Sequence, residues 1–150
     1  MAGKGRTLQP VSGIHDLVAL RLPALDIGSG IGRWVALQST DRLLRRFGQA
    51  DVLKLSPGAQ LSMKERATAD EVWALIEGEA TFEWEDLRPS SPTSGASARL
   101  ASREPTAVLV PFGVAFRVTA GTSRALLLRL TTHGDDEDPV ADLFRVDPAA

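Results

Sequence analysis

The residues of this chain best suited to chemistry are two cations and a carboxylate that lie close together in the sequence, Lys64, Arg66 and Glu71. A buried charge without a partner is costly, so we expect Glu71 to pair with Lys64 or Arg66. The cation left over would attract an anionic or keto-bearing ligand. Lys64 could stabilise an enolate, and Glu71 could act as a base if burial raised its pKa. Lys64 and Glu71 are therefore the candidate catalytic residues.

A second interpretation of the same residues is structural. Lys64 and Arg66 could lie at a strand end, with their aliphatic stems on the sheet and their charged groups in water. Glu71 would then be a rim partner of small energetic value. Because strand ends are the least certain part of a sequence-based prediction, both interpretations stay open.

Strands and turns must position these residues. Side chains alternate along a strand, so Ser62 shares the face of Lys64, and Trp73 shares the face of Glu71. The sequence predicts a β-hairpin over 72–85 with its turn at Glu77-Gly78. Further strands are expected at 17–22, 34–38 and 50–55, and a helical turn or a loop at 41–47. The interior should be filled by Phe82, Trp84, Phe116, Val118, Leu126 and Leu128.

The spacing of Gly58, Lys64, Arg66, Glu71 and Gly78 resembles the first motif of the cupin superfamily. Members that bind a metal carry two histidines where this chain has Lys64 and Arg66. The two histidines of this chain lie outside the motif, before it and after it. We therefore expect no metal and no cofactor.

The loop over 86–95 carries a sharper resemblance, which extends to a later turn. The matching positions are Asp86, Leu87, Arg88, Ser91, Pro92, Thr93 and Gly95, followed by Pro111, Gly113, Val114 and Ala115. These residues are similar to segments of the dTDP-4-dehydrorhamnose 3,5-epimerases, and the resemblance runs from Val52 to Pro139. It implies a cupin-type jelly roll that binds a sugar nucleotide and acts on the carbons beside a keto group. Phe116 stands where the family has a histidine.

The familiar catalytic set cannot be carried over to this chain. The resemblance implies a histidine that removes protons, a lysine that stabilises the enolate and a tyrosine that returns a proton. The chain has no tyrosine, the family's histidine is missing from 59–66, and Glu71 falls near the place of the lysine. Any reaction would need different chemistry.

Arg88 has two interpretations as well. Its planar guanidinium could reach a phosphate of the ligand. Alternatively, the loop folds by serine and threonine turns while Arg88 pairs with Asp86, and we favour this structural role. The complete set of candidate ligand-binding residues is Ser62, Lys64, Arg66, Glu71, Trp73, Arg88 and Phe116.

The stretch LDIGSGIGRWVAL, residues 25–37, resembles the glycine-rich motif of S-adenosylmethionine-dependent methyltransferases. Backbone amides of Gly28, Gly30 and Gly32 could approach a nucleotide-like ligand there. Such enzymes need repeated strand-helix units, and few amphipathic helices are predicted after Gly58. A glycine-rich connection between two strands is the preferred interpretation.

Composition restricts the remaining possibilities. The 150 residues are enough for one domain over 1–150, with a flexible start at 1–10, a barrel core at about 50–132 and an extension at 133–150. The chain has no cysteine, which excludes disulfides and thiolate catalysis. A net charge of -2 with mixed signs argues against nucleic acid. No apolar run suits a membrane span or a signal peptide, so we expect a cytoplasmic protein.

The sequence thus predicts an all-β, cupin-type double-stranded jelly roll, with open strand edges that favour a homodimer. The expected function is that of an epimerase-related protein that binds a sugar nucleotide or another anionic carbohydrate, with an isomerase activity of altered chemistry left open. The alternative is a non-enzymatic binding or structural cupin whose barrel is sealed by an internal salt bridge. A methyltransferase is the third possibility.

Overall fold

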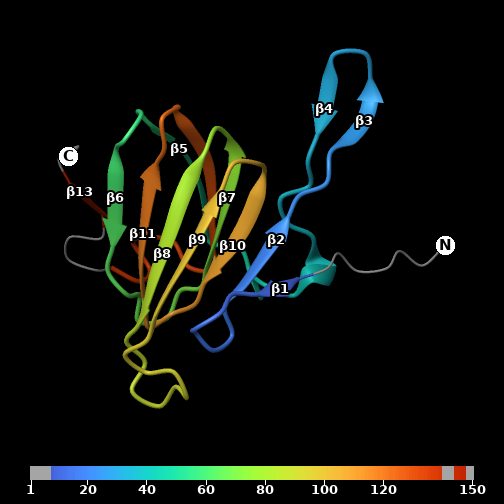
Figure 1. Cartoon of the computed structure of the whole chain (residues 1–150). Coiled ribbons are helices and arrows are strands. Elements are labelled where there is room, and N and C mark those ends of the chain that lie inside the picture. Colours follow the sequence, from blue (N-terminus) through green and yellow to red (C-terminus); the bar gives the residue numbers. More distant parts are fainter. Residues whose placement is uncertain (1–7, 140–143, 148–150) are drawn as a thin grey trace.

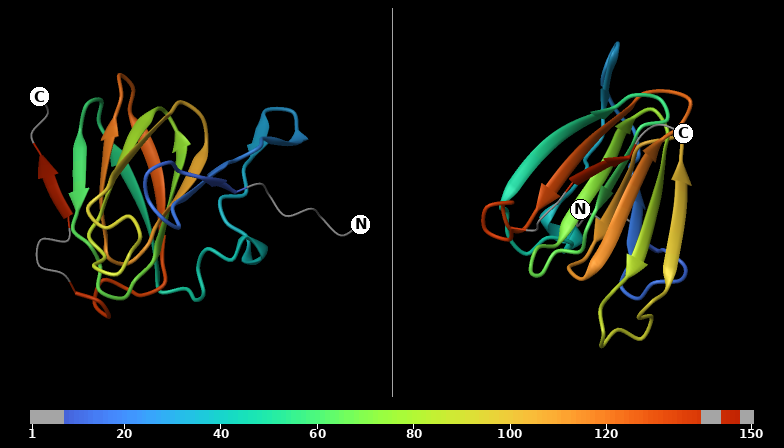
Figure 2. Two further views of the ribbon diagram at one scale, coloured as in Figure 1. Left: turned by 60° about the horizontal axis from the view of Figure 1, so that its bottom comes forward. Right: turned by 90° about the vertical axis from the view of Figure 1, so that its left-hand side faces the viewer.

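Two antiparallel β-sheets face each other in the computed structural model, which describes residues 8–139 and 144–147 (Figure 1 and Figure 2). The strands of the six-stranded sheet are, in order, β1 (Gln9–Pro10), β2 (Val18–Arg21), β10 (Thr106–Val110), β7 (Glu71–Glu77), β12 (Ala125–Thr131) and β5 (Gln49–Leu55). Those of the five-stranded sheet are β13 (Phe144–Asp147), β6 (Gln60–Met63), β11 (Val114–Ala120), β8 (Ala80–Asp86) and β9 (Ser97–Ser102). The predicted jelly roll is confirmed.

Alternate residues of each strand build the core between the sheets. Phe82, Trp84, Phe116 and Val118 are buried there, as predicted. The ring centroids of Trp73 and Phe116 are 5.1 Å apart, and those of Phe82 and Phe116 are 6.0 Å apart. A layer of aromatic rings therefore fills the centre of the jelly roll.

The predicted hairpin over 72–85 is wrong, because its two strands belong to different sheets. β7 is hydrogen-bonded to β10 and β12, whereas β8 is hydrogen-bonded to β11 and β9. The turn at Gly78 carries the chain from one sheet to the other. Gly78 has a φ of 91°, and a Cβ added to it would collide with the carbonyl oxygen of Arg124. The two strands thus face each other across the core instead of pairing side by side.

The prediction that Leu126 and Leu128 fill the interior is also wrong. Strand β12 turns Ala125, Leu127, Arg129 and Thr131 inward and the residues between them outward. The run of leucines at 126–128 has no alternation of apolar and polar residues. Pairing with the neighbouring strands and a bulge between Leu126 and Leu127 therefore decide which residues point inward. As a result, the Arg129 side chain of β12 lies inside the jelly roll.

The chain before β5 covers the outer face of the six-stranded sheet. The predicted strands at 17–22 and 50–55 are present as β2 and β5. The predicted strand at 34–38 is wrong, because this segment forms no strand and precedes a 3-10 helix, η1 (Ser39–Asp41). Its apolar residues pack on the sheet instead, in a cluster of Leu20, Leu22, Val72, Ala74 and Ala107 with Leu8, Ala36, Leu37, Leu43, Leu44, Ile76, Leu109 and Leu128.

The glycine-rich stretch forms a two-stranded hairpin, β3 (Leu25–Gly28) and β4 (Ile31–Arg33), which projects from the two sheets (Figure 1). A methyltransferase motif needs a helix after the glycines and a parallel sheet. The structure has a second strand there and antiparallel sheets, so the methyltransferase interpretation is wrong.

The two larger sheets recruit strands from both ends of the chain. β2 lies before the predicted core of 50–132, and β13 pairs with β6 although it lies after that core. Residues 1–7 of the predicted flexible start lie outside the described residues. The single domain over 1–150 stays a prediction.

Candidate functional site

A closed network of charges occupies one end of the interior, with Glu71 at its centre. The Oε1 atom of Glu71 accepts hydrogen bonds from Arg129 Nε at 2.6 Å and from Trp73 Nε1 at 3.0 Å. Its Oε2 atom accepts from Arg129 NH2 at 2.9 Å and from Arg66 NH1 at 2.9 Å. The side chains of Glu71, Arg66 and Arg129 are at most 1% exposed. The expected pair of Glu71 and Arg66 is therefore present, and Arg129 joins it.

Three aspartates complete the network at its outer side. Arg129 NH1 donates to Asp51 at 2.6 Å, and Arg129 NH2 donates to Asp135 at 2.9 Å. Arg66 NH1 donates to Asp135 at 3.2 Å, and its NH2 donates to the carbonyl oxygen of Asp138 at 2.8 Å. Two guanidinium groups thus face four carboxylates, and the net positive charge expected from the sequence is absent.

The acidic loop after β12 is held in place by this network. The Asp138 carboxylate accepts hydrogen bonds from the backbone N–H groups of Thr68, at 2.9 Å, and of Ala69, at 2.8 Å. Burial works against the charge on Asp135, but the guanidinium of Arg129 outweighs it and lowers the pKa of this carboxyl. Burial likewise opposes the charge on Arg129, yet its hydrogen bonds to Glu71 and Asp135 raise its pKa. Asp135 and Arg129 are therefore both charged at neutral pH.

Aromatic side chains fill the space next to the network. The Arg129 guanidinium lies 5.0 Å from the ring centroid of Phe144 and 6.0 Å from that of Trp73. Trp73 is fully buried, and Phe116 is 3% exposed. Among the described residues, side chains pack closely against one another at this level of the interior.

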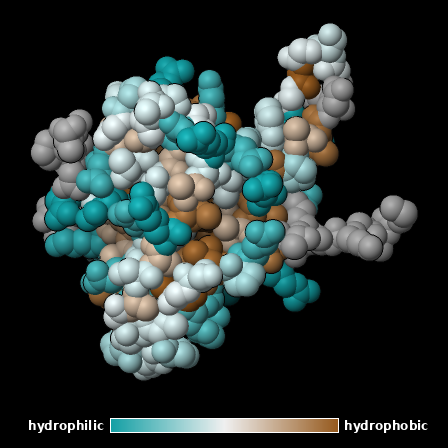
Figure 3. All heavy atoms as spheres, in the orientation of Figure 1, coloured by the Kyte–Doolittle hydropathy of each residue, from teal (hydrophilic) through white to brown (hydrophobic). Residues whose placement is uncertain are grey.

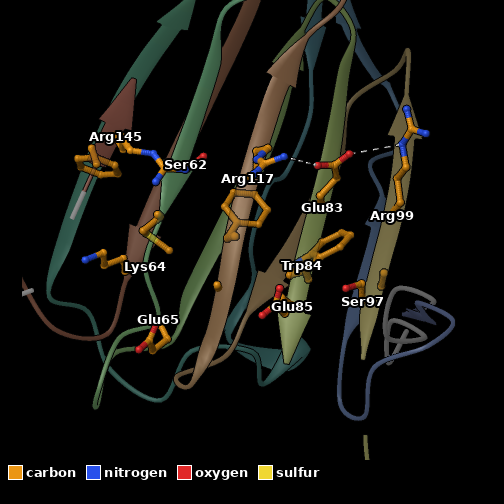
Figure 4. Close-up of a pocket in the computed structure, with 15 residues that line it drawn as sticks. Ser62, Lys64, Glu65, Glu83, Trp84, Glu85, Ser97, Arg99, Arg117 and Arg145 are labelled. Carbon is orange, nitrogen blue, oxygen red and sulfur yellow. Dashed lines mark hydrogen bonds and ion pairs between the residues drawn. The ribbon is translucent and has the colours of Figure 1, made fainter. Parts of the chain in front are cut away.

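A hollow of about 880 Å³ lies instead on the outer face of the five-stranded sheet (Figure 4). We call it the outer hollow, and its polar lining is Ser62, Lys64, Glu65, Glu83, Glu85, Ser97, Arg99, Arg117 and Arg145. Lys64 is exposed there, and Phe116 contributes to the floor although its ring packs inward. Glu83 lies between Arg117, at 3.4 Å, and Arg99, at 3.7 Å.

Arg88 belongs to a third place, the loop that follows β8. The buried carboxylate of Asp86 accepts hydrogen bonds from Arg88 Nε at 2.9 Å, Ser91 Oγ at 2.6 Å and Thr93 Oγ1 at 2.8 Å. The hydrogen bond from Arg88 is the main reason why the pKa of Asp86 lies far below its usual range. Arg88 also donates to the carbonyl oxygen of His15 at 2.8 Å. These contacts agree with the structural role considered above, in which Arg88 pairs with Asp86 and the loop folds through its serine and threonine side chains.

The structure thus distributes the predicted ligand-binding residues over three places. It brings together Arg66, Glu71 and Trp73 in the interior, and Ser62, Lys64 and Phe116 at the outer hollow. Arg88 lies beside a separate hollow of about 600 Å³ at the end of the barrel. The candidate catalytic residues Lys64 and Glu71 are therefore not in one site.

Sequence reasoning missed Arg129 with its partners Asp51 and Asp135, and it missed Asp138, which pairs with Arg66. A single arginine inside the apolar run of β12 was the available signal, because a charge in a buried strand needs a partner. The aspartates gave no such signal, since acidic loop residues are ordinarily solvated. Only the fold brings them to the two arginines.

Two other kinds of site are absent from the described residues. Within residues 8–139 and 144–147, no three histidine, cysteine, aspartate or glutamate side chains are arranged to hold a metal ion. The same part of the chain contains no helix of the length and apolarity that a membrane span requires.

The sequence matches no protein-family model and no curated protein. Solved structures are similar to it in fold. A dTDP sugar isomerase from Desulfovibrio desulfuricans has a TM-score of 0.74 and 19% identity, over 91% of this chain and 88% of that one. A dTDP-4-dehydrorhamnose 3,5-epimerase from Elizabethkingia anophelis has a TM-score of 0.72 and 16% identity, over 90% of this chain and 79% of that one.

A third structure, RmlC from Streptococcus suis in complex with dTDP-D-xylose, has a TM-score of 0.74 and 17% identity, over 88% of this chain and 72% of that one. Identities at this level establish the fold and leave the function to be argued from the site. The chain therefore has the cupin-type jelly roll of the dTDP-4-dehydrorhamnose 3,5-epimerases and related dTDP-sugar isomerases.

Proposed function

We propose that this protein binds a sugar nucleotide or a similar anionic carbohydrate and does not epimerise it. The observation that supports this proposal is the state of Glu71, whose two oxygens each accept two hydrogen bonds inside a closed interior. A general base must reach the proton that it removes. Glu71 has no free approach, and Lys64 lies elsewhere, on the outer face.

The outer hollow has the size and chemistry for such a ligand. Its volume of about 880 Å³ falls within the usual range for small-molecule sites, ~300–1,000 Å³. Lys64, Arg117 and Arg145 lie on or next to three adjacent strands, where they can contact a diphosphate (Figure 4). Ser62 and Glu85 offer hydrogen bonds to sugar hydroxyls.

The structural neighbours suggest which anion to test. The Streptococcus suis protein is described in complex with dTDP-D-xylose, and one from Legionella pneumophila in complex with dTDP-4-keto-L-rhamnose. Because the fold alone is shared, the transfer of a dTDP-sugar ligand to this chain is an analogy. It makes dTDP and dTDP-glucose the first compounds to measure.

Isothermal titration calorimetry with dTDP and dTDP-glucose tests the proposal. We expect binding that weakens at least about tenfold, which is ~1.4 kcal/mol, in Lys64→Ala. Lys54→Ala is the matched control, because Lys54 is an exposed lysine on the other sheet. Deuterium incorporation from D2O into a dTDP-4-keto-6-deoxysugar, followed by NMR, should not exceed the background rate. Enzyme-dependent exchange would overturn the claim that the protein does not epimerise.

The second candidate is a structural cupin that binds no small molecule. The buried pair of Glu71 and Arg129 favours it, because the salt bridge seals the barrel as that alternative requires. The absence of binding to dTDP compounds by the unaltered protein would support this candidate over the first.

The proposal includes a homodimer, since β5 leaves one edge of the six-stranded sheet open. The cytoplasmic location expected from the sequence stays a prediction.

A further inference from the structure

The second hollow of the structure lies at the end of the barrel, beside the loop that follows β8 and projects from the sheets (Figure 1). We call it the end hollow, and its walls are residues 65–67, 87–92 and 112–113 together with His15. Its volume of about 600 Å³ falls within the ~300–1,000 Å³ of small-molecule sites. The ligand contacts proposed above make no use of it.

The end hollow offers an apolar surface that the outer hollow lacks. Seven large apolar side chains are exposed among the described residues, and none of them lines the outer hollow. Two of them line the end hollow, Leu87, which is 40% exposed, and Phe112, which is 46% exposed. In Figure 3, hydrophilic side chains stand out from the face of the five-stranded sheet that is turned to the viewer. An aromatic ring of a ligand would therefore stack in the end hollow and not in the outer hollow.

Hydrogen bonds hold the walls of the end hollow in place. The Gly113 N–H donates to the carbonyl oxygen of Arg66 at 2.9 Å, and the Leu87 N–H donates to that of Gly113 at 3.0 Å. The Phe112 N–H donates to Asp70 Oδ1 at 2.9 Å. The three wall segments are thus tied to one another, and the exposed ring of Phe112 lies on an anchored turn. A hollow that is already formed costs a ligand little ordering entropy.

The two arginines of the end hollow are already engaged by carboxylates. Arg66 pairs with Glu71 and Asp135, and Arg88 pairs with Asp86. A phosphate would have to compete with these carboxylates for the same donors. The end hollow therefore suits an uncharged, flat group better than a phosphate.

Glu65 lines both hollows, so the two adjoin at this residue. Lys64 lines the outer hollow and Ala67 lines the end hollow, and their Cα atoms are at most about 11 Å apart along the chain. Lys64 and Glu65 are exposed, and neither side chain has a hydrogen bond or an ion pair with another described residue. The Lys64 ammonium can bind a phosphate, and the Glu65 carboxylate can accept a hydrogen bond from a sugar hydroxyl.

We propose that the end hollow binds the nucleoside of a nucleoside diphosphate, with the base stacked on Phe112 beside Leu87. The pentose then lies at Glu65 and the diphosphate at Lys64. A cation, a hydrogen-bond acceptor and an apolar wall thus follow one another in the order of diphosphate, pentose and base. The second sugar of a sugar nucleotide lies in the outer hollow. This inference rests on the proposed function and adds the part of the molecule that recognises the base.

Isothermal titration calorimetry with dTDP and with inorganic pyrophosphate separates the two halves of this site. In Phe112→Ala, the affinity for dTDP should fall at least about tenfold, corresponding to ~1.4 kcal/mol, because a stacked base loses its platform. The affinity for pyrophosphate should not change, since pyrophosphate has no base. Phe47→Ala is the matched control, because Phe47 is 67% exposed and lines neither hollow. It should leave both affinities unchanged.

Photo-cross-linking of the unaltered protein locates the base directly. Iododeoxyuridine diphosphate carries a photoreactive base on the same diphosphate, and mass spectrometry identifies the residue to which it becomes attached. We expect attachment within 87–92 or 111–113. Attachment to residues of the outer hollow, or an unchanged affinity for dTDP in Phe112→Ala, would overturn the placement of the nucleoside and leave the proposed ligand intact. Failure of the unaltered protein to bind dTDP or dTDP-glucose would overturn both.

Discussion

The carboxylate of Glu71 and the guanidinium of Arg129 form a two-pronged ion pair, with N–O distances of 2.6 and 2.9 Å, and neither side chain is exposed to water. The two residues are on adjacent strands, β7 and β12. Burial of two charges is costly, and only good geometry with additional hydrogen bonds compensates for it. Trp73, Arg66, Asp51 and Asp135 supply such bonds to the pair, so the network is sensitive to the loss of any of these members.

The first prediction concerns the removal of one charge from this unit. Glu71→Gln leaves two buried guanidinium groups with fewer compensating charges, and breaking a buried pair costs about 3–5 kcal/mol. We therefore expect the free energy of unfolding in urea to fall by about this amount. Glu77→Gln, at an exposed position at the end of the same strand, should change it by less than about 0.5 kcal/mol.

A double replacement distinguishes a broken pair from a general packing defect. Glu71→Leu combined with Arg129→Met removes both charges while keeping apolar volume. Because apolar groups of similar size often replace a buried ion pair without loss, we expect the double variant to be more stable than the sum of its single variants implies. Additive losses would show that the two charges act independently.

The second prediction concerns acid. The pKa of Asp138 is lowered, because its hydrogen bonds from the Ala69 and Thr68 amides and the charge of Arg66 overcome the effect of burial. A carboxyl with a lowered pKa in the folded state stabilises the fold above its unfolded pKa of ~3.9 and loses this contribution as the pH falls through the folded value. The melting temperature should therefore drop steeply below about pH 4.

Asp138→Asn should flatten this part of the pH profile, since the amide cannot titrate. Asp136→Asn, at an exposed neighbouring position, is the control and should leave the slope unchanged. Melting curves from pH 2 to pH 7 would measure the effect. Equal slopes for Asp138→Asn and the unaltered protein would contradict the role given to the Asp138 carboxylate.

The third prediction concerns the loop after β8. Asp86 holds Arg88, Ser91 and Thr93, so its loss leaves several partly buried donors without their acceptor. Because an unsatisfied buried group costs ~1–3 kcal/mol and these donors are only partly buried, Asp86→Ala should destabilise the protein by about 1–3 kcal/mol. Amide hydrogen exchange should accelerate over 87–96, whereas Glu85→Ala, one residue earlier and exposed, should not change it. Unchanged exchange in the Asp86 variant would show that the loop is held by other contacts.

The sequence contained enough information for the all-β fold, because alternation and turn residues fix strands locally. Phe82 and Trp84 alternate with polar residues, so their inward direction was readable. The sequence could not distinguish a hairpin over 72–85 from a connection between two sheets, because a turn near Gly78 is compatible with either arrangement. In the leucine run of β12 apolar and polar residues do not alternate, so the sequence did not indicate which residues point inward. The buried position of Arg129 could not be predicted for the same reason.

The candidate site was predictable only in part. The pairing of Glu71 with Arg66 follows from the cost of an unpaired buried charge. The separation of Lys64 from Glu71 could not be predicted in this way, because β6 ends at Met63 and the alternation of side chains does not continue reliably beyond it. A shift of one position at a strand end changes which side of the sheet a side chain occupies. The three aspartates reach the arginines only through the fold.

The fourth prediction concerns the crossing between the sheets. Gly78 and Gly58 both have positive φ, 91° and 75°, but only at Gly78 would an added Cβ meet another atom, the carbonyl oxygen of Arg124. Gly58→Ala should therefore cost only the conformational penalty, about 1–2 kcal/mol. Gly78→Ala should cost clearly more, because β12 must also move away from the turn. Urea unfolding of the two variants isolates this steric contribution, and equal losses would show that the crossing tolerates a side chain.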